Sequence, residues 1–323
     1  MTLYEHLNSF AGLPVVDFGE PYGRLEWNAA ADAPTEPAAV AWRVSAWEED
    51  EHWDKDVSPA FLGAFEAFLS SPVAPVATAL VIGSWGYAAM NSVPLGAICD
   101  AAPRLPALRH LFIGDILSEE CEISWIKQGD VSPVFEAYPR LHTLRVRGAE
   151  DLALRPLRHD TLRELAFESG GLPALIVRAV GECDLPELRH LELWLGTDNY
   201  GGDATVEDLA PILSGARLPA LTYLGLRDAE IADLVAAAVA GAPVVARLQT
   251  LDLSLGMLSD IGGSALLAGQ PLTHLRRLDL HHHYLSEALV ARLTGELEPA
   301  GVEVDLSERL QEDAEDRYIA VAE

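Results

Sequence analysis

Lysine is nearly missing from this sequence. Lys55 and Lys127 are the only two, and the 22 basic side chains stand against 50 acidic ones, which gives a formal net charge of −28. Nucleic acids and anionic membrane surfaces attract proteins chiefly through positive charge. The composition therefore predicts a protein that binds neither, and a protein or peptide partner that carries a basic patch.

Cysteine is also scarce, and long apolar runs are missing. The sequence has three cysteines, Cys99, Cys121 and Cys183, which are far apart and form no C-x-x-C motif. This spacing predicts reduced thiols and not a disulfide framework. The first residues lack the basic start and apolar core of a signal peptide. The longest apolar stretch, IADLVAAAVAGAPVVA, is interrupted by Asp233 and Pro243. We therefore expect a cytoplasmic protein.

Motifs of the common enzyme classes are missing as well. No glycine-rich loop ends in Gly-Lys-Ser or Gly-Lys-Thr, and the IGSWG stretch around Ser84 differs from a nucleophile elbow. None of the thiols has a local catalytic signature. The sequence predicts a protein that is not an enzyme and uses no cofactor.

What the sequence does contain is a leucine repeat. The pattern L-x-x-L-x-L, with a variable last apolar residue, occurs seven times between Leu108 and Leu280, at spacings of 21 to 33 residues. Each L-x-L segment predicts a short strand, and several of the following segments have helical spacing. One strand and one helix per repeat predict an α/β solenoid, with a parallel sheet on its concave face and helices on its convex face.

Three stretches carry a closer resemblance. They are SEECEISWIKQGDVSP (118–133), LELWLGTDNYGGDATVEDLAPIL (191–213) and QPLTHLRRLDLHHHYLS (270–286). Together with the repeat, they resemble the leucine-rich-repeat proteins of the ribonuclease-inhibitor-like class, and more narrowly an uncharacterised bacterial family. The resemblance implies a leucine-rich-repeat horseshoe and no particular activity.

The two ends of the chain depart from the repeat. Residues 1–75 are predicted to form an N-terminal cap, because a solenoid must cover its terminal core, and Ser58-Pro59 predicts the start of a helix there. Residues 76–306 are the predicted solenoid. Residues 307–323 are an acidic C-terminal tail, in which Tyr318, Ile319 and Val321 are expected to cover the last sheet edge.

Side-chain alternation along the strands selects candidate binding residues on the concave face. Tryptophan, tyrosine and arginine are enriched at binding hot spots, and the acidic residues would match a basic partner. In the alternative interpretation, Trp194 packs under the following loop and the arginines pair with Glu168 and Glu192. The predicted partner-binding residues are Arg145, Arg147, Glu168, Glu192, Trp194, Tyr200, Tyr223, Arg227, Asp252, Asp279 and His281.

Two repeats carry extra length just after their strands. The additions include GDILSEECEISWIKQGD (114–130) and TDNYGGD (197–203). Loops on a rigid scaffold often carry function, so both are predicted to contribute to binding. Trp125 is expected to anchor the first loop to the body of the protein.

The stretch LDLHHHYLS (278–286) supports a second hypothesis. Asp279, His281 and His283 would line one face of an extended segment, and Asp252 would lie on the neighbouring strand. A carboxylate and two imidazoles can form a facial metal site. In the alternative interpretation, these residues form a polar surface patch without metal. A metal-binding protein or metal-dependent enzyme centred on these residues is therefore the second hypothesis, behind a protein-binding scaffold.

Overall fold

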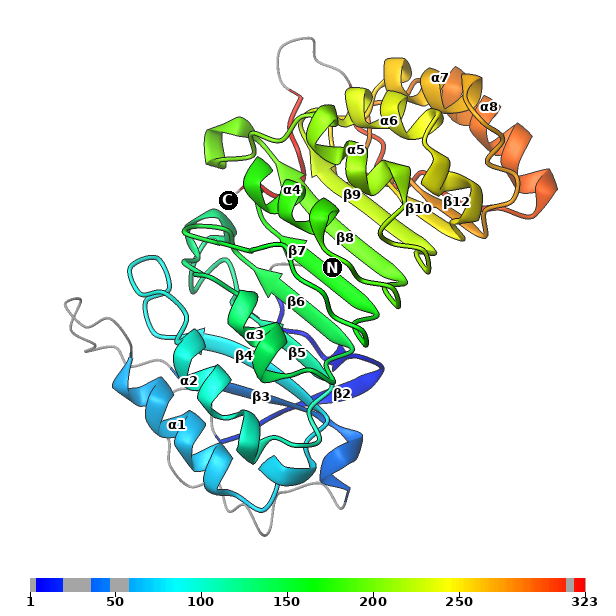
Figure 1. Ribbon diagram of the computed structural model, residues 1–323. Coiled ribbons are helices and arrows are strands. Elements are labelled where there is room, and N and C mark those ends of the chain that lie inside the picture. The colour runs from blue at the N-terminus through cyan, green and yellow to red at the C-terminus, as the bar shows by residue number, and fades with distance from the viewer. Residues whose placement is uncertain (1–3, 20–35, 47–57, 312–316, 323) are drawn as a thin grey trace. The chain divides into compact units, whose positions relative to one another are not determined.

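The computed structural model describes residues 4–19, 36–46, 58–311 and 317–322. The chain divides into two compact units, residues 1–155 and 156–322, in which strands alternate with helices (Figure 1). The predicted α/β class and the parallel pairing of the repeats are confirmed. Parts of the predicted cap and of the acidic tail lie outside the described residues, and the predicted boundary at residue 75 stays a prediction.

The first unit has five strands in parallel pairs, β2 to β6, that follow one another in chain order, while β1 pairs with β2 in antiparallel fashion. Its leucines stack in columns, as the pairing of Leu111 with Leu144 illustrates. The elements are β1 (Ser9–Phe10), β2 (Leu13–Asp17), β3 (Ala41–Ala46), α1 (Pro59–Ser70), β4 (Ala79–Trp85), α2 (Leu95–Asp100), β5 (His110–Ile113), α3 (Ser132–Ala137) and β6 (Thr143–Arg147).

Helix α1 begins where the sequence predicts. The Ser58 side chain accepts a hydrogen bond from the Phe61 N–H at 3.1 Å, which caps a helix whose first residue is Pro59. Phe61, Phe65, Phe68 and Leu69 are buried against the unit. The apolar stripe therefore fixes which side of α1 packs inward.

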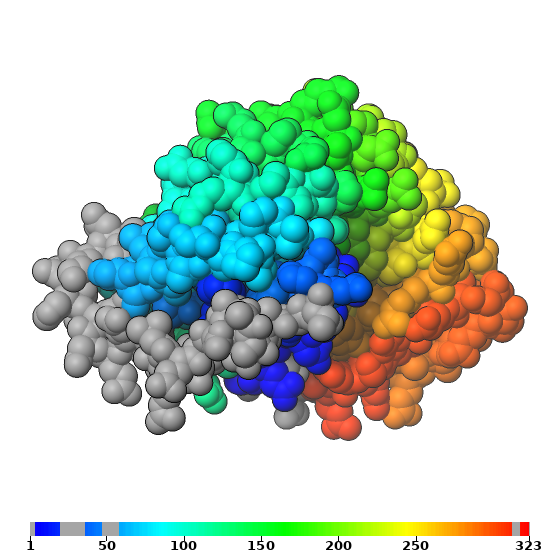
Figure 2. Space-filling model, turned by 90° about the horizontal axis from the view of Figure 1, so that it is seen from below, coloured from blue at the N-terminus to red at the C-terminus, as the bar shows by residue number. Residues whose placement is uncertain are grey.

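The second unit continues the same design. Leu251 pairs with Leu224 on one neighbouring strand and with Leu278 on the other, and Asp252 lies beside Asp279, as the repeat predicts. In Figure 2 the colours of this unit follow one another from green through yellow to red, as expected for repeats that stack in chain order. The elements are β7 (Glu164–Glu168), α4 (Ala174–Glu182), β8 (His190–Gly196), α5 (Val206–Ser214), β9 (Tyr223–Ala229), α6 (Ala232–Ala240), β10 (Thr250–Asp252), α7 (Asp260–Ala268), β11 (Arg277–Asp279), α8 (Glu287–Leu297) and β12 (Glu303–Asp305).

Helix ends in the second unit also follow their sequence signals. Helix α6 stops before Gly241, and Ser259 caps α7 by accepting a hydrogen bond from the Ile261 N–H. The exact buried face was harder to predict. Leu234 is 60% exposed, and the buried side of α6 is formed by alanines and by Val235 and Val239. No helix in the described ranges is long and apolar enough to cross a membrane.

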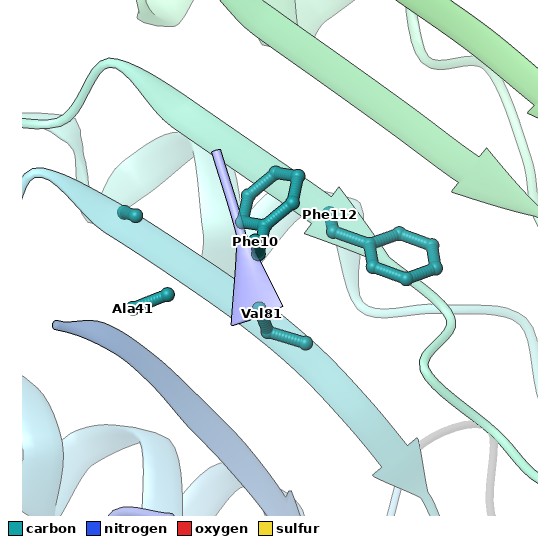
Figure 3. Packing of buried hydrophobic residues seen from close by; sticks show 5 residues of the cluster. Phe10, Ala41, Val81 and Phe112 are labelled. Carbon is teal, nitrogen blue, oxygen red and sulfur yellow. The ribbon is translucent and has the colours of Figure 1, made fainter. Parts of the chain in front are cut away.

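An N-terminal segment covers part of the first unit's sheet on the face that carries no helices, here called the helix-free face. Phe10 packs with Ala41, Ala79, Val81 and Phe112, all of which are fully buried. Figure 3 shows the Phe10 ring over the strands that carry Val81 and Phe112. The segment around Phe10 thus covers part of this face of the first unit, where the sequence predicts open concave surface.

Candidate functional site

The helix-free face of the second unit carries an excess of acidic side chains. Strands β7 to β12 place seven carboxylates and two arginines on that face. The carboxylates are Glu164, Glu168, Glu192, Asp252, Asp279, Glu303 and Asp305, and the arginines are Arg227 and Arg277. Most of the predicted partner-binding residues therefore share one surface, and its net charge is negative.

Arg227 holds the centre of this surface together. Its Nη1 donates to Glu192 Oε1 at 3.0 Å, and its Nε lies 3.0 Å from Ser254 Oγ and 3.3 Å from Asp252 Oδ2. Burial acts to lower the pKa of Arg227, but Asp252 and Glu192 overcome it and raise that pKa above its ordinary value. These groups are almost fully buried, so they form an internal network in which the alternative of intramolecular pairing holds for Arg227 and Glu192.

Trp194 lies inside this network and is not an exposed anchor. Its side chain is fully buried, its Nε1–H donates to Glu192 Oε1 at 2.7 Å, and the Arg227 guanidinium lies 5.3 Å from its ring centre. The indole is on the predicted face of β8, but neighbouring side chains cover it. Glu168 is likewise fully buried on β7.

A stacked pair of rings is the part of the network that reaches the surface. The His190 and Tyr223 rings lie 3.7 Å apart at an angle of 7°, and 28% of the His190 side chain is exposed. Asp252 Oδ2 accepts the Tyr223 hydroxyl at 2.7 Å, and Glu192 Oε2 lies 3.2 Å from His190 Nε2. Sequence reasoning missed His190 as a site residue, although its register opposite Tyr223 was readable from the repeat.

Arg277 organises the last strands of the sheet. It donates to Asp279 at 2.9 Å and to Asp305 at 2.8 Å, and it also pairs with Glu303. His281 Nδ1 lies 2.7 Å from Asp279 Oδ1, and this hydrogen bond raises the pKa of His281. Burial acts to raise the pKa of Asp279, but its hydrogen bonds with His281 and Arg277 hold that pKa at about 2.

The predicted metal ligands do not all meet. The His283 side chain is fully buried, its Nε2 lies 3.1 Å from the Leu306 carbonyl oxygen, and its Nδ1 accepts the Leu285 N–H. Strand β11 ends at Asp279, so the expected alternation does not reach residue 283. Asp305 takes that place: ligand atoms of Asp279, His281 and Asp305 all lie within 4.8 Å of one another.

In the first unit, Arg147 is buried and supports structure. Its Nη1 donates to the Ile116 carbonyl oxygen at 3.3 Å, and its guanidinium lies 5.3 Å from the Phe112 ring centre. Arg145, two residues earlier on β6, is half-exposed. Of the two arginines predicted to bind a partner here, Arg145 alone keeps an accessible side chain.

The first enlarged loop presents an aromatic side chain to solvent. Trp125 is 56% exposed, so the prediction that it anchors the loop is wrong. Ile123 and Ile126 do so instead, with 1% and 0% exposure. A short 3-10 helix, Ile123–Trp125, turns the indole outward between these two buried side chains.

The second enlarged loop is a tightly packed turn. Gly196 has φ of 69°, and a Cβ on it would lie 2.0 Å from the Gly170 carbonyl oxygen. Tyr200 ends the 3-10 helix Asp198–Tyr200 and is half-exposed. The loop is therefore fixed by close backbone packing, and it holds Tyr200 at a defined position.

Comparison with solved structures identifies the fold family. The chain is 30% identical to a Bacteroides fragilis protein whose crystal structure was solved as a structural genomics target, over 84% of this chain and 78% of that one, with a TM-score of 0.73. The chain belongs to the leucine-rich-repeat proteins. This leucine-rich-repeat protein matches no protein-family model and no curated protein.

Two further structures resemble the leucine-rich-repeat chain more distantly. A complex of TLR13 with ssRNA13 is 15% identical over 74% of this chain and 34% of that one, with a TM-score of 0.38. An internalin, InlF, from Listeria monocytogenes is 13% identical over 86% and 71%, with a TM-score of 0.35. Similarities at this level carry no conclusion about ligands, so the prediction that nucleic acid does not bind rests on charge alone.

Proposed function

We propose that this leucine-rich-repeat protein is a non-enzymatic binding scaffold for a protein or peptide with a basic patch. Its contact surface is the helix-free face of the second unit, from the His190–Tyr223 stack to Glu303 and Asp305. Trp125 and Tyr200, on the two enlarged loops, are further candidate contacts. Net negative charge disfavours nucleic acids and anionic membranes as partners.

The observation that carries this proposal is the stacked His190–Tyr223 pair. Glu192 and Asp252 hold the two rings from the buried side, so the half-exposed aromatic surface loses little side-chain entropy when a partner binds. Tyrosine is enriched at binding hot spots. The surrounding carboxylates would steer and orient a positively charged segment.

Peptide binding tests the proposal. Labelled peptides of equal length with zero to four arginines are titrated onto the full chain, and we expect affinity to rise with arginine number and to fall with added salt. Replacing Glu303 and Asp305 together by Gln and Asn should weaken binding of the four-arginine peptide by up to about thirtyfold, because exposed ion pairs contribute up to about 1 kcal/mol each.

A matched variant separates a specific surface from general charge attraction. Glu182→Gln/Glu207→Gln makes the same change of net charge on the exposed sides of α4 and α5. The control should bind like the wild type. Equal loss in both double variants, or binding that does not depend on arginine number, would contradict the proposal.

The Asp279, His281 and Asp305 cluster supports metal binding as a second candidate function. Two carboxylates and one imidazole are suitable ligands for a divalent transition metal. Arg277 now neutralises both carboxylates, so a metal ion would have to displace it. Calorimetric titration of the purified, tag-free chain with Zn²⁺ and Mn²⁺ tests this function. Saturable one-to-one binding that disappears in His281→Ala supports it, and no heat of binding contradicts it.

A further inference from the structure

The last described residues of the chain, Arg317–Ala322, cross the end of β9 and the segments that follow β10 and β11. We call this segment the strap. Tyr318 N–H donates to the Tyr284 hydroxyl at 2.9 Å, Ala320 N–H to the Leu255 carbonyl oxygen at 2.8 Å, and Val321 N–H to Asp228 Oδ1 at 3.0 Å. Figure 1 draws the strap in red beside β9. It runs back over three successive repeats, and does not cover the last sheet edge as the sequence predicts.

The surface under the strap, called the strap seat, is built from equivalent positions of the repeat. Asp228, Leu255 and His282 each follow the second strand leucine by two residues, and their φ angles are 52°, 68° and 58°. Glu308, at the equivalent position of the next repeat, has φ of 56°. The left-handed conformation is therefore a property of this repeat position, and Tyr284, two residues after His282, completes the seat.

The strap leaves two buried polar atoms of the seat without a hydrogen-bond partner among the described residues. The Asp228 side chain is fully buried, and its Oδ2 has no hydrogen-bond partner among the described residues. The adjacent Arg227 directs its guanidinium to Glu192 and Asp252 instead. Burial raises the pKa of Asp228 well above its ordinary range. His282 Nδ1 is likewise buried without a partner in the described part of the chain.

Asp115 in the first unit is a buried carboxylate whose two oxygens both accept hydrogen bonds. It also follows the second core residue of its strand by two residues. Its Oδ1 accepts the backbone N–H of Leu7, in the N-terminal segment, at 3.3 Å. There, however, Arg43 Nη1 donates to Asp115 Oδ2 at 2.9 Å, so the buried carboxylate has a cation. Arg43, on β3, also donates to the Leu7 carbonyl oxygen at 3.3 Å, so the same cation contacts the N-terminal segment. The strap, in contrast, offers Asp228 only backbone N–H groups.

We propose that the strap is a displaceable intramolecular ligand, and that its seat accepts an extended peptide segment whose lysine or arginine reaches Asp228 Oδ2. The strap binds through main-chain N–H groups, which any extended peptide can supply, through the buried Ile319, and through Tyr318, whose ring lies edge-on to His282 and Tyr284. Tethering gives the strap a high effective concentration. A competing segment gains what the strap lacks, a charge-assisted hydrogen bond to a buried carboxylate.

This inference shares with the proposed function the class of partner, a basic segment, but it concerns a different surface. The probes are fluorescein-labelled hexapeptides: the strap sequence, the same peptide with Val321→Lys, and a control with Val321→Glu. They are titrated onto the full chain as wild type, as Ile319→Asp, and as Ile319→Asp/Asp228→Asn. Ala320→Pro, which removes the N–H bonded to Leu255, is a second way to release the strap. Thermal melting verifies that each variant is folded.

We expect both release variants to bind the Val321→Lys peptide at least tenfold more tightly than the wild type does. They should prefer it over the strap peptide by about tenfold, because a hydrogen bond between two charged groups is stronger than one between neutral groups. Asp228→Asn should abolish that preference. Equal binding to wild type and released chains, no binding to either folded release variant, or a preference that survives Asp228→Asn would overturn the inference. Loss of arginine-peptide binding in the Glu303/Asp305 variant tests the proposed function separately.

Discussion

Asp115 and Asp228 occupy the same position of two repeats and hold opposite ends of the chain. Each follows the second core residue of its strand by two residues, and each accepts a backbone N–H, from Leu7 and from Val321 respectively. Burial acts to raise the pKa of both carboxyls. At Asp115, His6, Arg147 and Arg43 overcome that effect and lower the pKa, whereas at Asp228 the pKa stays raised. The two ends of the chain should therefore respond to pH in opposite ways.

Asp228→Asn should stabilise the protein at pH 8. A folded pKa above the unfolded one means that the stability linked to Asp228 is fully present below the unfolded pKa and is lost as pH rises through the folded pKa. Asparagine stays neutral and keeps the acceptor for Val321, so we expect a gain of roughly 1 kcal/mol or more in the free energy of unfolding. Urea unfolding at pH 8 and pH 3.5 measures this. The gain should vanish at pH 3.5, and an equal effect at both values would contradict the assignment.

Arg43→Met should destabilise the first unit. It removes the cation that is hydrogen-bonded to the fully buried Asp115 carboxylate and also breaks the pair with Asp17, and breaking a buried pair costs about 3–5 kcal/mol. Because the folded pKa of Asp115 is lowered, its contribution is present above the unfolded pKa and is lost as pH falls through the folded pKa. Unfolding curves between pH 7 and pH 3 should thus converge for wild type and variant. Arg104→Met, which breaks an exposed pair with Glu66, serves as the control and should leave stability nearly unchanged.

Trp194→Ala should lower stability and not just binding. The indole is fully buried and is bonded to Glu192, so its removal should cost about 3–5 kcal/mol. Guanidinium unfolding gives the value directly. A loss below about 1 kcal/mol would mean that Trp194 is accessible and free to act as a contact residue after all.

Trp125→Ala should leave stability nearly unchanged and weaken partner binding. The side chain is 56% exposed, and Ile123 and Ile126 anchor its loop, so unfolding free energy should change by less than about 0.5 kcal/mol. If the first enlarged loop contributes to partner binding, affinity for the cognate partner should fall at least tenfold. Trp125→Phe is the conservative control and should recover most of the affinity. Unchanged affinity in the alanine variant would remove this loop from the binding surface.

The leucine repeat predicted register well and exposure poorly. The spacing of Leu224, Leu251 and Leu278 placed those residues side by side because a stacked repeat leaves one way to align its strands. The same spacing says nothing about which later segment covers a strand face. Trp194 was placed on the right face of β8 and still proved to be buried.

Contacts made by the chain ends were the hardest to predict, since they join residues far apart in sequence. Phe10 lies over Phe112, and no local pattern links the two. A signal was nevertheless present. Val81 and Phe112 are apolar at positions where the repeat predicts solvent, and adjacent residues of this kind indicate that something covers them. The burial of His283 was not predicted for another reason. Strand β11 ends four residues before it, and the alternation of side chains ends with the strand.

The strap also makes contacts that depend on the spacing of the repeats. Its hydrogen-bonding partners Asp228, Leu255 and Tyr284 belong to three consecutive repeats. Inserting or deleting one 27-residue repeat would keep the leucine core continuous. It would also shift these three partners relative to residues 317–322, so their hydrogen bonds could not all form. The spacing of these three partners should therefore limit which repeat insertions or deletions the strap contacts can tolerate.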